Sequence, residues 1–160
     1  MQKVIVGMAD LNFVKYPDIL TTIGLGSCVG IALYDPSTKM AGLAHVMLPD
    51  STKIQNNTNE AKFADTAIKK LVSDMLRSGA SKSFMRAKIA GGAQMFSFNS
   101  TNESMRIGDR NTEAVIKLLA EYRIPIVAND TGNTYGRTIE LYSEDGRLVV
   151  KTIGHGNKII

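Results

Sequence analysis

The chain is poor in several features that often dominate a sequence. Its 160 residues include one cysteine, four prolines and no tryptophan, and aromatic residues make up only 6%. A single cysteine excludes a disulfide framework within the chain and suits a reducing compartment. No apolar run reaches the ~18 residues that a membrane-spanning helix needs, and the N-terminal stretch meets Asp10 too early for a signal peptide. We therefore expect a cytoplasmic protein without membrane insertion.

Charge of one sign is not concentrated anywhere in the sequence. The chain has 19 basic and 15 acidic residues, a net charge of +4, and no basic run longer than Lys69-Lys70. Nucleic-acid-binding proteins gather basic residues on one face and often add stacking aromatic side chains. The composition therefore favours an ordinary solvated surface and excludes nucleic acid as the expected partner, while an acidic protein partner stays compatible with the net charge.

Patterns for metal and nucleotide binding are also missing. Two histidines and one cysteine have no paired spacing, and neither HExxH nor CxxC occurs. The glycine-rich stretch Gly24–Gly30 has the wrong spacing for a dinucleotide-binding loop, and β-branched residues follow it where a helix would have to begin. We expect no metal and no cofactor.

Apolar periodicity predicts a single α/β domain over residues 1–160, with a flexible tail at 153–160. Strands are expected at 2–7, 19–23, 29–34, 40–47, 84–90, 124–129, 138–142 and 148–152, and helices at 60–78 and 107–122. Asn57 or Asn59 is the expected cap of the first helix and Asp109 of the second. Residues 10–18, 48–58 and 97–104 read as connections, and 124–129 as a central strand. This order indicates mixed or antiparallel sheets with helices covering one face.

The only cysteine, Cys28, and one of the two histidines, His45, stand at corresponding ends of a predicted hairpin. Cys28 opens the strand that leads out of the glycine bend Gly24–Ser27, and His45 closes the next strand. A thiol beside an imidazole can lose its proton to the ring, and the imidazolium then stabilises the thiolate and lowers its pKa. Glycines let a substrate approach the backbone, so amides at Gly26, Ser27, Cys28 and Val29 are candidate oxyanion donors.

A structural interpretation of the same residues stands beside this one. A lone cysteine flanked by aliphatic residues is commonly a small buried hydrophobe, and a histidine at a strand end is commonly structural. The break Gly91-Gly92-Ala93 is either a tight bend or a backbone wall near the cysteine.

The residues around Cys28 and His45 resemble a known family. The string from Thr22 to Pro36, followed by Gly42–Ser51, is similar to the signature of the CheD chemoreceptor glutamine deamidases of bacterial chemotaxis. Further similar motifs are Gly91-Gly92-Ala93-x-Met95-Phe96, Ile107-Gly108-x-Arg110-Asn111 and Asp130-x-Gly132-x-x-x-Gly136-Arg137. The resemblance implies an α/β/β sandwich with two main helices, similar to the catalytic domain of the cytotoxic necrotizing factor toxins.

The same resemblance implies an enzyme that hydrolyses glutamine side chains of chemoreceptor cytoplasmic helices to glutamate and ammonia. Cys28 would be the nucleophile and His45 the general base and acid. The family's hydroxyl residue stands six positions before the cysteine, which is Thr22 here, and would orient His45. Strand alternation puts Thr21 and Thr22 on opposite faces, and the pattern alone does not choose between them.

The resemblance also implies a CheC-type phosphatase as a partner. The family has Gly-Gly where this chain has Gly132-Asn133, and asparagine tolerates left-handed backbone. Two other functions stay open: a non-catalytic module that binds and stimulates the phosphatase, and a different Cys-His hydrolase acting on peptide bonds or small amides.

Overall fold

The structure is a computed structural model that describes residues 1–95 and 106–160. The connection expected at 97–104 lies outside these residues. The described residues form two helices, α1 (Ala64–Arg77) and α2 (Ile107–Glu121), and short 3-10 turns at Ser51–Lys53 and Lys82–Phe84. Their strands are β1 (Lys3–Ile5), β2 (Leu11–Lys15), β3 (Ile19–Leu25), β4 (Val29–Asp35), β5 (Met40–Val46), β6 (Arg86–Gly91), β7 (Ile126–Thr131), β8 (Arg137–Tyr142), β9 (Leu148–Thr152) and β10 (Gly156–Ile159).

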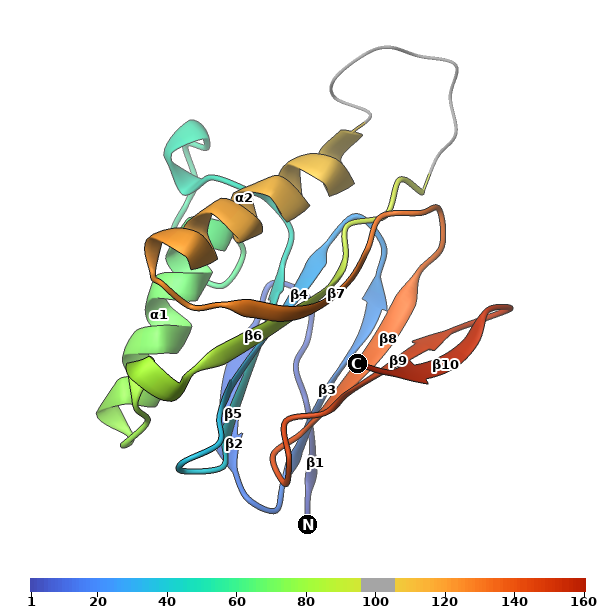
Figure 1. Ribbon diagram of the computed structural model, residues 1–160. Helices are drawn as coiled ribbons and strands as arrows, with labels where there is room; N and C mark the ends of the chain where they lie inside the picture. The colour runs from blue at the N-terminus through green and yellow to red at the C-terminus, as the bar shows by residue number, and fades with distance from the viewer. Residues whose placement is uncertain (96–105) are drawn as a thin grey trace.

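The strands form two five-stranded sheets. The helix-backed sheet has the order β2-β5-β4-β6-β7, and the outer sheet has the order β1-β3-β8-β9-β10. Both are mixed, because β6 and β7 are parallel in one and β1 and β3 in the other. Figure 1 shows α1 and α2 on one side of the helix-backed sheet and the outer sheet on its other side. The protein is therefore the layered α/β/β sandwich that the sequence predicts.

Alternation along β4 explains the two cores. Val29, Ile31 and Leu33 face the helices and pack in one buried cluster with residues of α1 such as Leu71. Ala32, two residues after Gly30, belongs to the cluster between the sheets, as does Cys28. Because successive strand residues point to opposite faces, Cys28, Gly30 and Ala32 all face the outer sheet. The cysteine thus lies between the two sheets, at the end of β4.

Three strand predictions need correction. Residues 10–18 contain β2, which pairs with β5 at the edge of the helix-backed sheet. Its composition is mixed because polar residues, Asn12 and Lys15, are exposed between apolar residues that pack on both cores. β7 is an edge strand and not a central one, so its β-branched residues alternate between half-buried and exposed. The tail expected to be flexible contains β10, which pairs antiparallel with β9.

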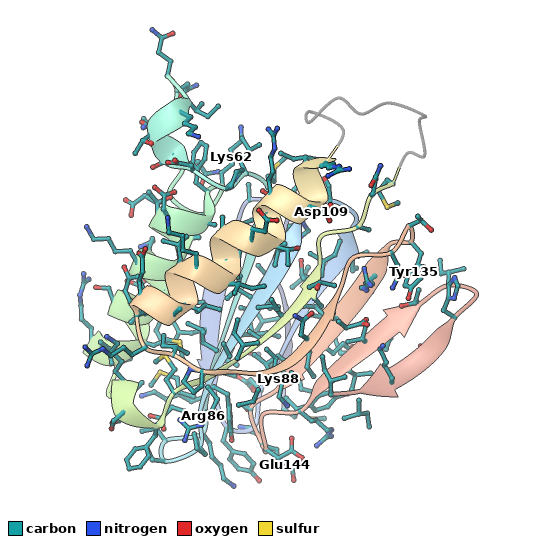
Figure 2. All side chains as sticks on the ribbon, turned by 45° about the horizontal axis from the view of Figure 1, so that its top comes forward. Lys62, Arg86, Lys88, Asp109, Tyr135 and Glu144 are labelled. Atoms are coloured by element: carbon teal, nitrogen blue, oxygen red, sulfur yellow. The ribbon has the colours of Figure 1, made fainter. Side chains whose placement is uncertain are left out.

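The predicted helix caps are also wrong. α1 begins after Phe63 and α2 after Arg106, and neither residue makes a side-chain capping hydrogen bond. Asn59 instead accepts from the amide of Ala61, before the helix begins. Asp109 lies in the first turn of α2 with its side chain exposed, as Figure 2 shows. None of the described helices is long and apolar enough to cross a membrane.

Candidate active site

The β4–β5 hairpin brings the cysteine and histidine to one face of the helix-backed sheet. Gly30 lies directly opposite His45 in the antiparallel register. Cys28 is two residues before Gly30, so its side chain points to the same face as the imidazole. The Cα atoms of such diagonal neighbours are about 7–8 Å apart, and their Cβ atoms are somewhat closer. Gly30 has no side chain, and the side chains of Ile139 and Leu25 fill the position where its Cβ would lie.

The backbone bonds of His45 point away from β4. Its N–H donates to Asp10 O at 3.0 Å and its C=O accepts from Ala9 N at 3.0 Å. Opposed residues in antiparallel strands alternate between hydrogen-bonded and non-hydrogen-bonded pairs, and side chains approach most closely in the latter. Gly30 and His45 therefore form a pair of the close kind.

The hydroxyl of Thr22, on β3 of the outer sheet, meets the ring of His45 across the space between the sheets. Thr22 Oγ1 lies 2.7 Å from His45 Nδ1 and 2.6 Å from Val6 O. A hydroxyl has one proton and a carbonyl oxygen only accepts. Thr22 therefore donates to Val6, and Nδ1–H of His45 donates to Thr22. This pattern assigns the proton of neutral His45 to Nδ1.

The other ring nitrogen, Nε2, is left with a free lone pair. It is buried and has no hydrogen-bond partner among the described residues, and the whole side chain is fully buried. Burial lowers the pKa of His45, because the charged imidazolium is disfavoured away from water. The ring is therefore a neutral base whose acceptor nitrogen is not used by the fold.

Thr21 takes a different position. Its hydroxyl donates to Ile139 O at 3.0 Å within the outer sheet. Both threonines are buried, but only Thr22 contacts His45. The sequence pattern did not choose between the two threonines as the partner of His45. In the structure they lie on opposite faces of β3, and only Thr22 faces the ring.

Cys28 is buried, with 7% of the residue exposed, and packs in the cluster between the sheets. Burial raises its pKa, which its own backbone N–H lowers in part. Among the described residues, Nε2 of His45 makes no hydrogen bond to the thiol or to any other group. No cation or second donor among the described residues offsets this burial, so the raised thiol pKa runs against the sequence-based expectation of a depressed one.

The Gly91-Gly92 break is a backbone wall against the cysteine. Gly92 N donates to Cys28 O at 2.8 Å, and Ala93 N donates to Gly26 O at 2.8 Å. Gly91 has φ +104°, and a Cβ there would lie 2.3 Å from Cys28 O. Only glycine allows this approach, so the end of β6 determines where the backbone of Cys28 can lie.

The candidate oxyanion donors are not equally available. Gly26 N donates to Gly24 O at 3.1 Å. Val29 lies opposite Val46 inside the ladder, in a pair of the hydrogen-bonded kind because the neighbouring Gly30–His45 pair is not. No described backbone acceptor takes the amides of Ser27 and Cys28. These two amides are the donors that the backbone leaves free.

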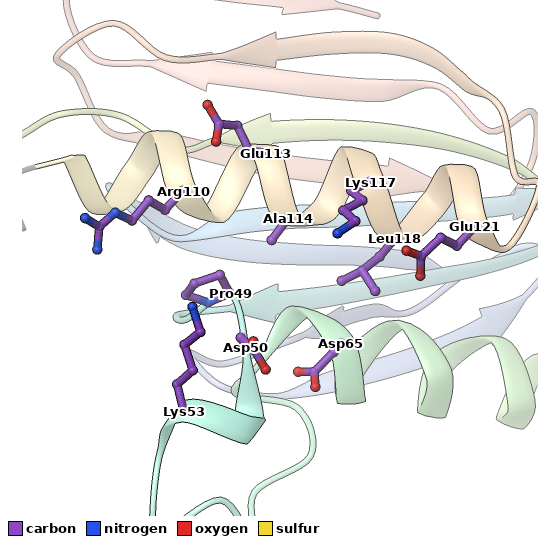
Figure 3. Close-up of a pocket in the computed structure, with 10 residues that line it drawn as sticks. All are labelled: Pro49, Asp50, Lys53, Asp65, Arg110, Glu113, Ala114, Lys117, Leu118 and Glu121. Atoms are coloured by element: carbon purple, nitrogen blue, oxygen red, sulfur yellow. The ribbon is translucent and has the colours of Figure 1, made fainter. Parts of the chain in front are cut away.

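A charged groove lies on the helix side of the molecule. It has a volume of about 670 Å³ and runs between α2 and the Pro49–Lys53 segment. Figure 3 shows Lys53, Arg110 and Lys117 around it together with acidic residues of both walls. Neither Cys28 nor His45 lines this groove, so it is separate from the candidate site.

The second histidine makes its described ring contact elsewhere in the fold. The ring of His155 stacks on Tyr135, with 4.1 Å between ring centroids; Tyr135 is labelled on the loop between β7 and β8 in Figure 2. Asn133 in the same loop has φ +60°, the left-handed conformation that asparagine tolerates. No described group of three or more histidine, cysteine or carboxylate side chains could hold a metal ion.

Comparison with known proteins identifies the family of this chain. The family model described as CheD chemotactic sensory transduction matches residues 47–152. The chain belongs to the CheD family. A relative from Caldanaerobacter subterraneus subsp. tengcongensis, named a probable chemoreceptor glutamine deamidase CheD, is 61% identical over 97% of this chain and 96% of its own. The chemoreceptor glutamine deamidase CheD of Halalkalibacterium halodurans is 54% identical over 97% of this chain and 96% of its own.

A likeness to a solved structure is much weaker. The Bacillus licheniformis hypothetical protein YfiH matches with a TM-score of 0.40 and 14% identity, over 76% of this chain and 49% of that one. A match at this level carries no argument about the CheD site. The implied likeness to the necrotizing factor toxins stays a prediction.

Two contributors to the CheD site were missed in the sequence. The carbonyl of Val6 determines the tautomer of His45 through Thr22, and a backbone group leaves no sequence signal. Asn111, quoted above only as part of a motif, is fully buried beside the hairpin. It stands three and four residues before Ala114 and Val115, so a polar residue on the predicted inward stripe of α2 was a signal that could have found it.

Proposed function

We propose that this protein hydrolyses glutamine side chains of chemoreceptors to glutamate and ammonia, with Cys28 as nucleophile and His45 as general base and acid. Its CheD relatives carry this activity in their names. The observation that supports the chemistry is the 2.7 Å contact between Thr22 Oγ1 and His45 Nδ1, which leaves Nε2 free on the face that Cys28 shares.

The first half of the reaction forms a thioester. Cys28 Sγ attacks the carboxamide carbon while its proton passes to His45 Nε2. The tetrahedral oxyanion then collapses, and the C–N bond breaks as Nε2–H protonates the leaving nitrogen to give ammonia. Nδ1–H stays bonded to Thr22 throughout, and the imidazolium that forms between these steps is stabilised by that contact.

The second half restores the thiol. A water molecule attacks the thioester carbon and gives one proton to Nε2. The C–S bond breaks, the sulfur takes that proton back from Nε2, and glutamate leaves. In this proposal the amides of Ser27 and Cys28, which no described backbone acceptor takes, donate to the oxyanion in both halves. No cofactor enters either step.

The resting pair is neutral in this proposal. Burial raises the pKa of the Cys28 thiol and lowers the pKa of the His45 imidazole, so both shifts oppose a thiolate–imidazolium pair. The proton therefore moves as attack occurs. Catalytic hydrogen bonds are often long in free enzymes and tighten with substrate, and bound glutamine would close the diagonal distance between the two side chains.

Ammonia release from a purified chemoreceptor cytoplasmic fragment tests the proposal. The wild type is expected to release ammonia and to make the fragment heavier by about one mass unit per site, while Cys28→Ala and Cys28→Ser release none above background. A fragment cut into shorter pieces would instead identify a peptidase. Release that persists in Cys28→Ala would exclude the nucleophile.

One observation favours a second function, a module that binds a CheC-type phosphatase and whose thiol is incidental. The thiol is buried and makes no bond to His45. In that case neither wild type nor Cys28→Ala would release ammonia, and both would bind and stimulate the phosphatase equally. The two proteins measured side by side in both assays therefore separate the functions.

A further inference from the structure

Asn111 joins α2 to both arms of the catalytic hairpin. Its Nδ2 donates to Ser27 O at 3.0 Å and to Met47 O at 2.9 Å. Ser27 precedes the nucleophile, and Met47 follows His45 by two residues. Figure 1 shows the beginning of α2 at the same end of the molecule as the β3–β4 turn. One amide group from a helix thus holds a carbonyl beside each proposed catalytic residue.

The contact stands where the strand ladder stops. The last paired residues of the hairpin are Val29 and Val46. Beyond them β4 continues into the glycine corner and β5 into the segment that leads to α1. Asn111 bridges the two arms just past this last pair, at Ser27, two residues before Val29, and at Met47, one residue after Val46.

The orientation of the Asn111 amide is dictated by its neighbours. Both bonded atoms are carbonyl oxygens, which only accept, so the NH2 group must face them. The other atom, Oδ1, is buried without a partner among the described residues, and the side chain is fully buried. A buried acceptor without a donor destabilises a fold. The unpaired oxygen offsets part of the stability that the two hydrogen bonds contribute.

We infer that Asn111 is a positioning residue that keeps Cys28 within reach of His45 by tying the two hairpin arms to α2. This inference rests on the proposed deamidation. Asn111 touches neither the thiol nor the ring through any described hydrogen bond, so it acts through the backbone of Ser27 and Met47. A misplacement of about 1 Å remote from the reacting atoms can reduce a rate by about 10²-fold.

Asn111→Leu keeps much of the side-chain volume but donates no hydrogen bond. Its kcat for ammonia release is expected to fall by about 10²-fold with KM changed less than about 3-fold, because substrate contacts remain and alignment does not. The urea midpoint should fall, because the carbonyls of Ser27 and Met47 lose their donor, so kcat is compared per folded molecule. An unchanged kcat per folded molecule would overturn the inference.

Asn111→Asp provides a readout that a merely structural role would not move. Its ionised carboxylate has no donor for the two carbonyls, whereas the protonated form donates to one of them. The ratio of its kcat to that of the wild type is therefore expected to rise several-fold from pH 8 to pH 5.5, while the ratio for Asn111→Leu stays flat. A ratio for Asn111→Asp that does not change between pH 8 and pH 5.5 would contradict the positioning role of Asn111. The matched control is Asn12→Asp, an exposed change that keeps the bond to Phe13 N.

A third measurement needs no substrate. Iodoacetamide modification of Cys28 should be several-fold faster in Asn111→Leu than in wild type and Asn12→Asp, because the released Ser27 carbonyl loosens the corner that buries the thiol. Rates equal to the wild type would overturn the inference whatever the deamidation assay gives. Wild-type protein that releases no ammonia would instead refute the proposed function.

Discussion

At the scale of single residues, one proton decides what His45 can do. The hydroxyl of Thr22 lies between a carbonyl oxygen and a ring nitrogen of His45. Its proton must point to the carbonyl of Val6, and the proton on Nδ1 must point to the Thr22 oxygen. Nε2 is left as the acceptor on the face of the cysteine. The chemistry proposed at Cys28 therefore depends on a residue in the other sheet.

Thr22→Val tests this dependence. The change keeps the shape and removes the hydroxyl, which leaves Nδ1 and Val6 O unpaired. We expect kcat for ammonia release to fall by about 10²-fold, since the general base loses its fixed tautomer, and the free energy of unfolding to fall by about 1–3 kcal/mol. Steady-state kinetics and urea unfolding measure the two effects.

Thr21→Val is the control for this change. Thr21 is also buried and also donates to one backbone carbonyl, but it does not contact His45. It should lose stability to a similar extent and keep its kcat. Equal losses of kcat in the two variants would show that the hydroxyl of Thr22 has no special role.

At the scale of elements, the position of Cys28 depends on how strand ends meet. The end of β6 contacts the cysteine backbone at a distance that excludes any Cβ at Gly91. The same glycine has a positive φ of 104°. Two requirements, one conformational and one steric, thus fall on one residue.

Gly91→Ala should therefore destabilise the protein for two separate reasons, one conformational and one steric. The left-handed conformation alone costs about 1–2 kcal/mol for a residue with a Cβ, and the contact with Cys28 O forces the corner to move. We expect a loss of more than about 2 kcal/mol in unfolding free energy and a large loss of ammonia release. Gly154→Ala isolates the conformational part, because its φ is +82° but no atom lies within 4 Å of the added Cβ. A Gly91→Ala protein no less stable than Gly154→Ala would contradict the steric argument.

The last strand, β10, offers a second test at this scale. It pairs with β9, and Lys158 bonds to Asp130 at 2.7 Å. Removing residues 153–160 should lower the urea midpoint, with about 1–3 kcal/mol of unfolding free energy lost. Ile153 is fully exposed, so Ile153→Ser should change nothing. A shortened chain as stable as the full one would restore the prediction of a flexible tail.

At the scale of the whole molecule, burial of titratable groups couples folding to pH. The pKa of His45 is lowered in the folded protein by burial, from an ordinary value of 6.5. Below that value the unfolded chain binds a proton that the folded chain does not, so the unfolding free energy decreases as pH falls. The contribution is fully present above about 6.5 and is lost toward the folded pKa.

Urea unfolding of wild type and His45→Asn at pH 7.5 and 5.5 measures this coupling. We expect wild type to lose more stability than His45→Asn between the two values, since the variant has no group at that position to protonate. Parallel losses would mean that the slope comes from elsewhere. The comparison stops above pH 5 because carboxyl groups with lowered pKa values also contribute below it. For Asp130 and Glu140 burial opposes ionisation, but hydrogen bonds from neighbouring cations outweigh it and lower both pKa values.

The sequence predicted the elements that have strong local patterns. The long apolar stripe of α1 and the hairpins β4–β5 and β8–β9 follow from spacing and turn residues within a short window. β2, the edge position of β7 and the strand β10 were missed, because each is decided by which neighbour it pairs with. Helix caps failed for a related reason, since α1 is entered from a paired segment in which Leu48 bridges Phe63.

For the candidate site, the chain by itself determined the chemistry that is available: one thiol, one histidine on a strand, and hydroxyls at two adjacent positions. Local spacing also placed Cys28 and His45 on one hairpin. Only the tertiary structure decided that Thr22 and not Thr21 meets the ring, that burial raises the thiol pKa, and that Asn111 ties the arms together. Those outcomes depend on contacts between sheets and between a sheet and a helix, and the residues that make them are far apart in the chain.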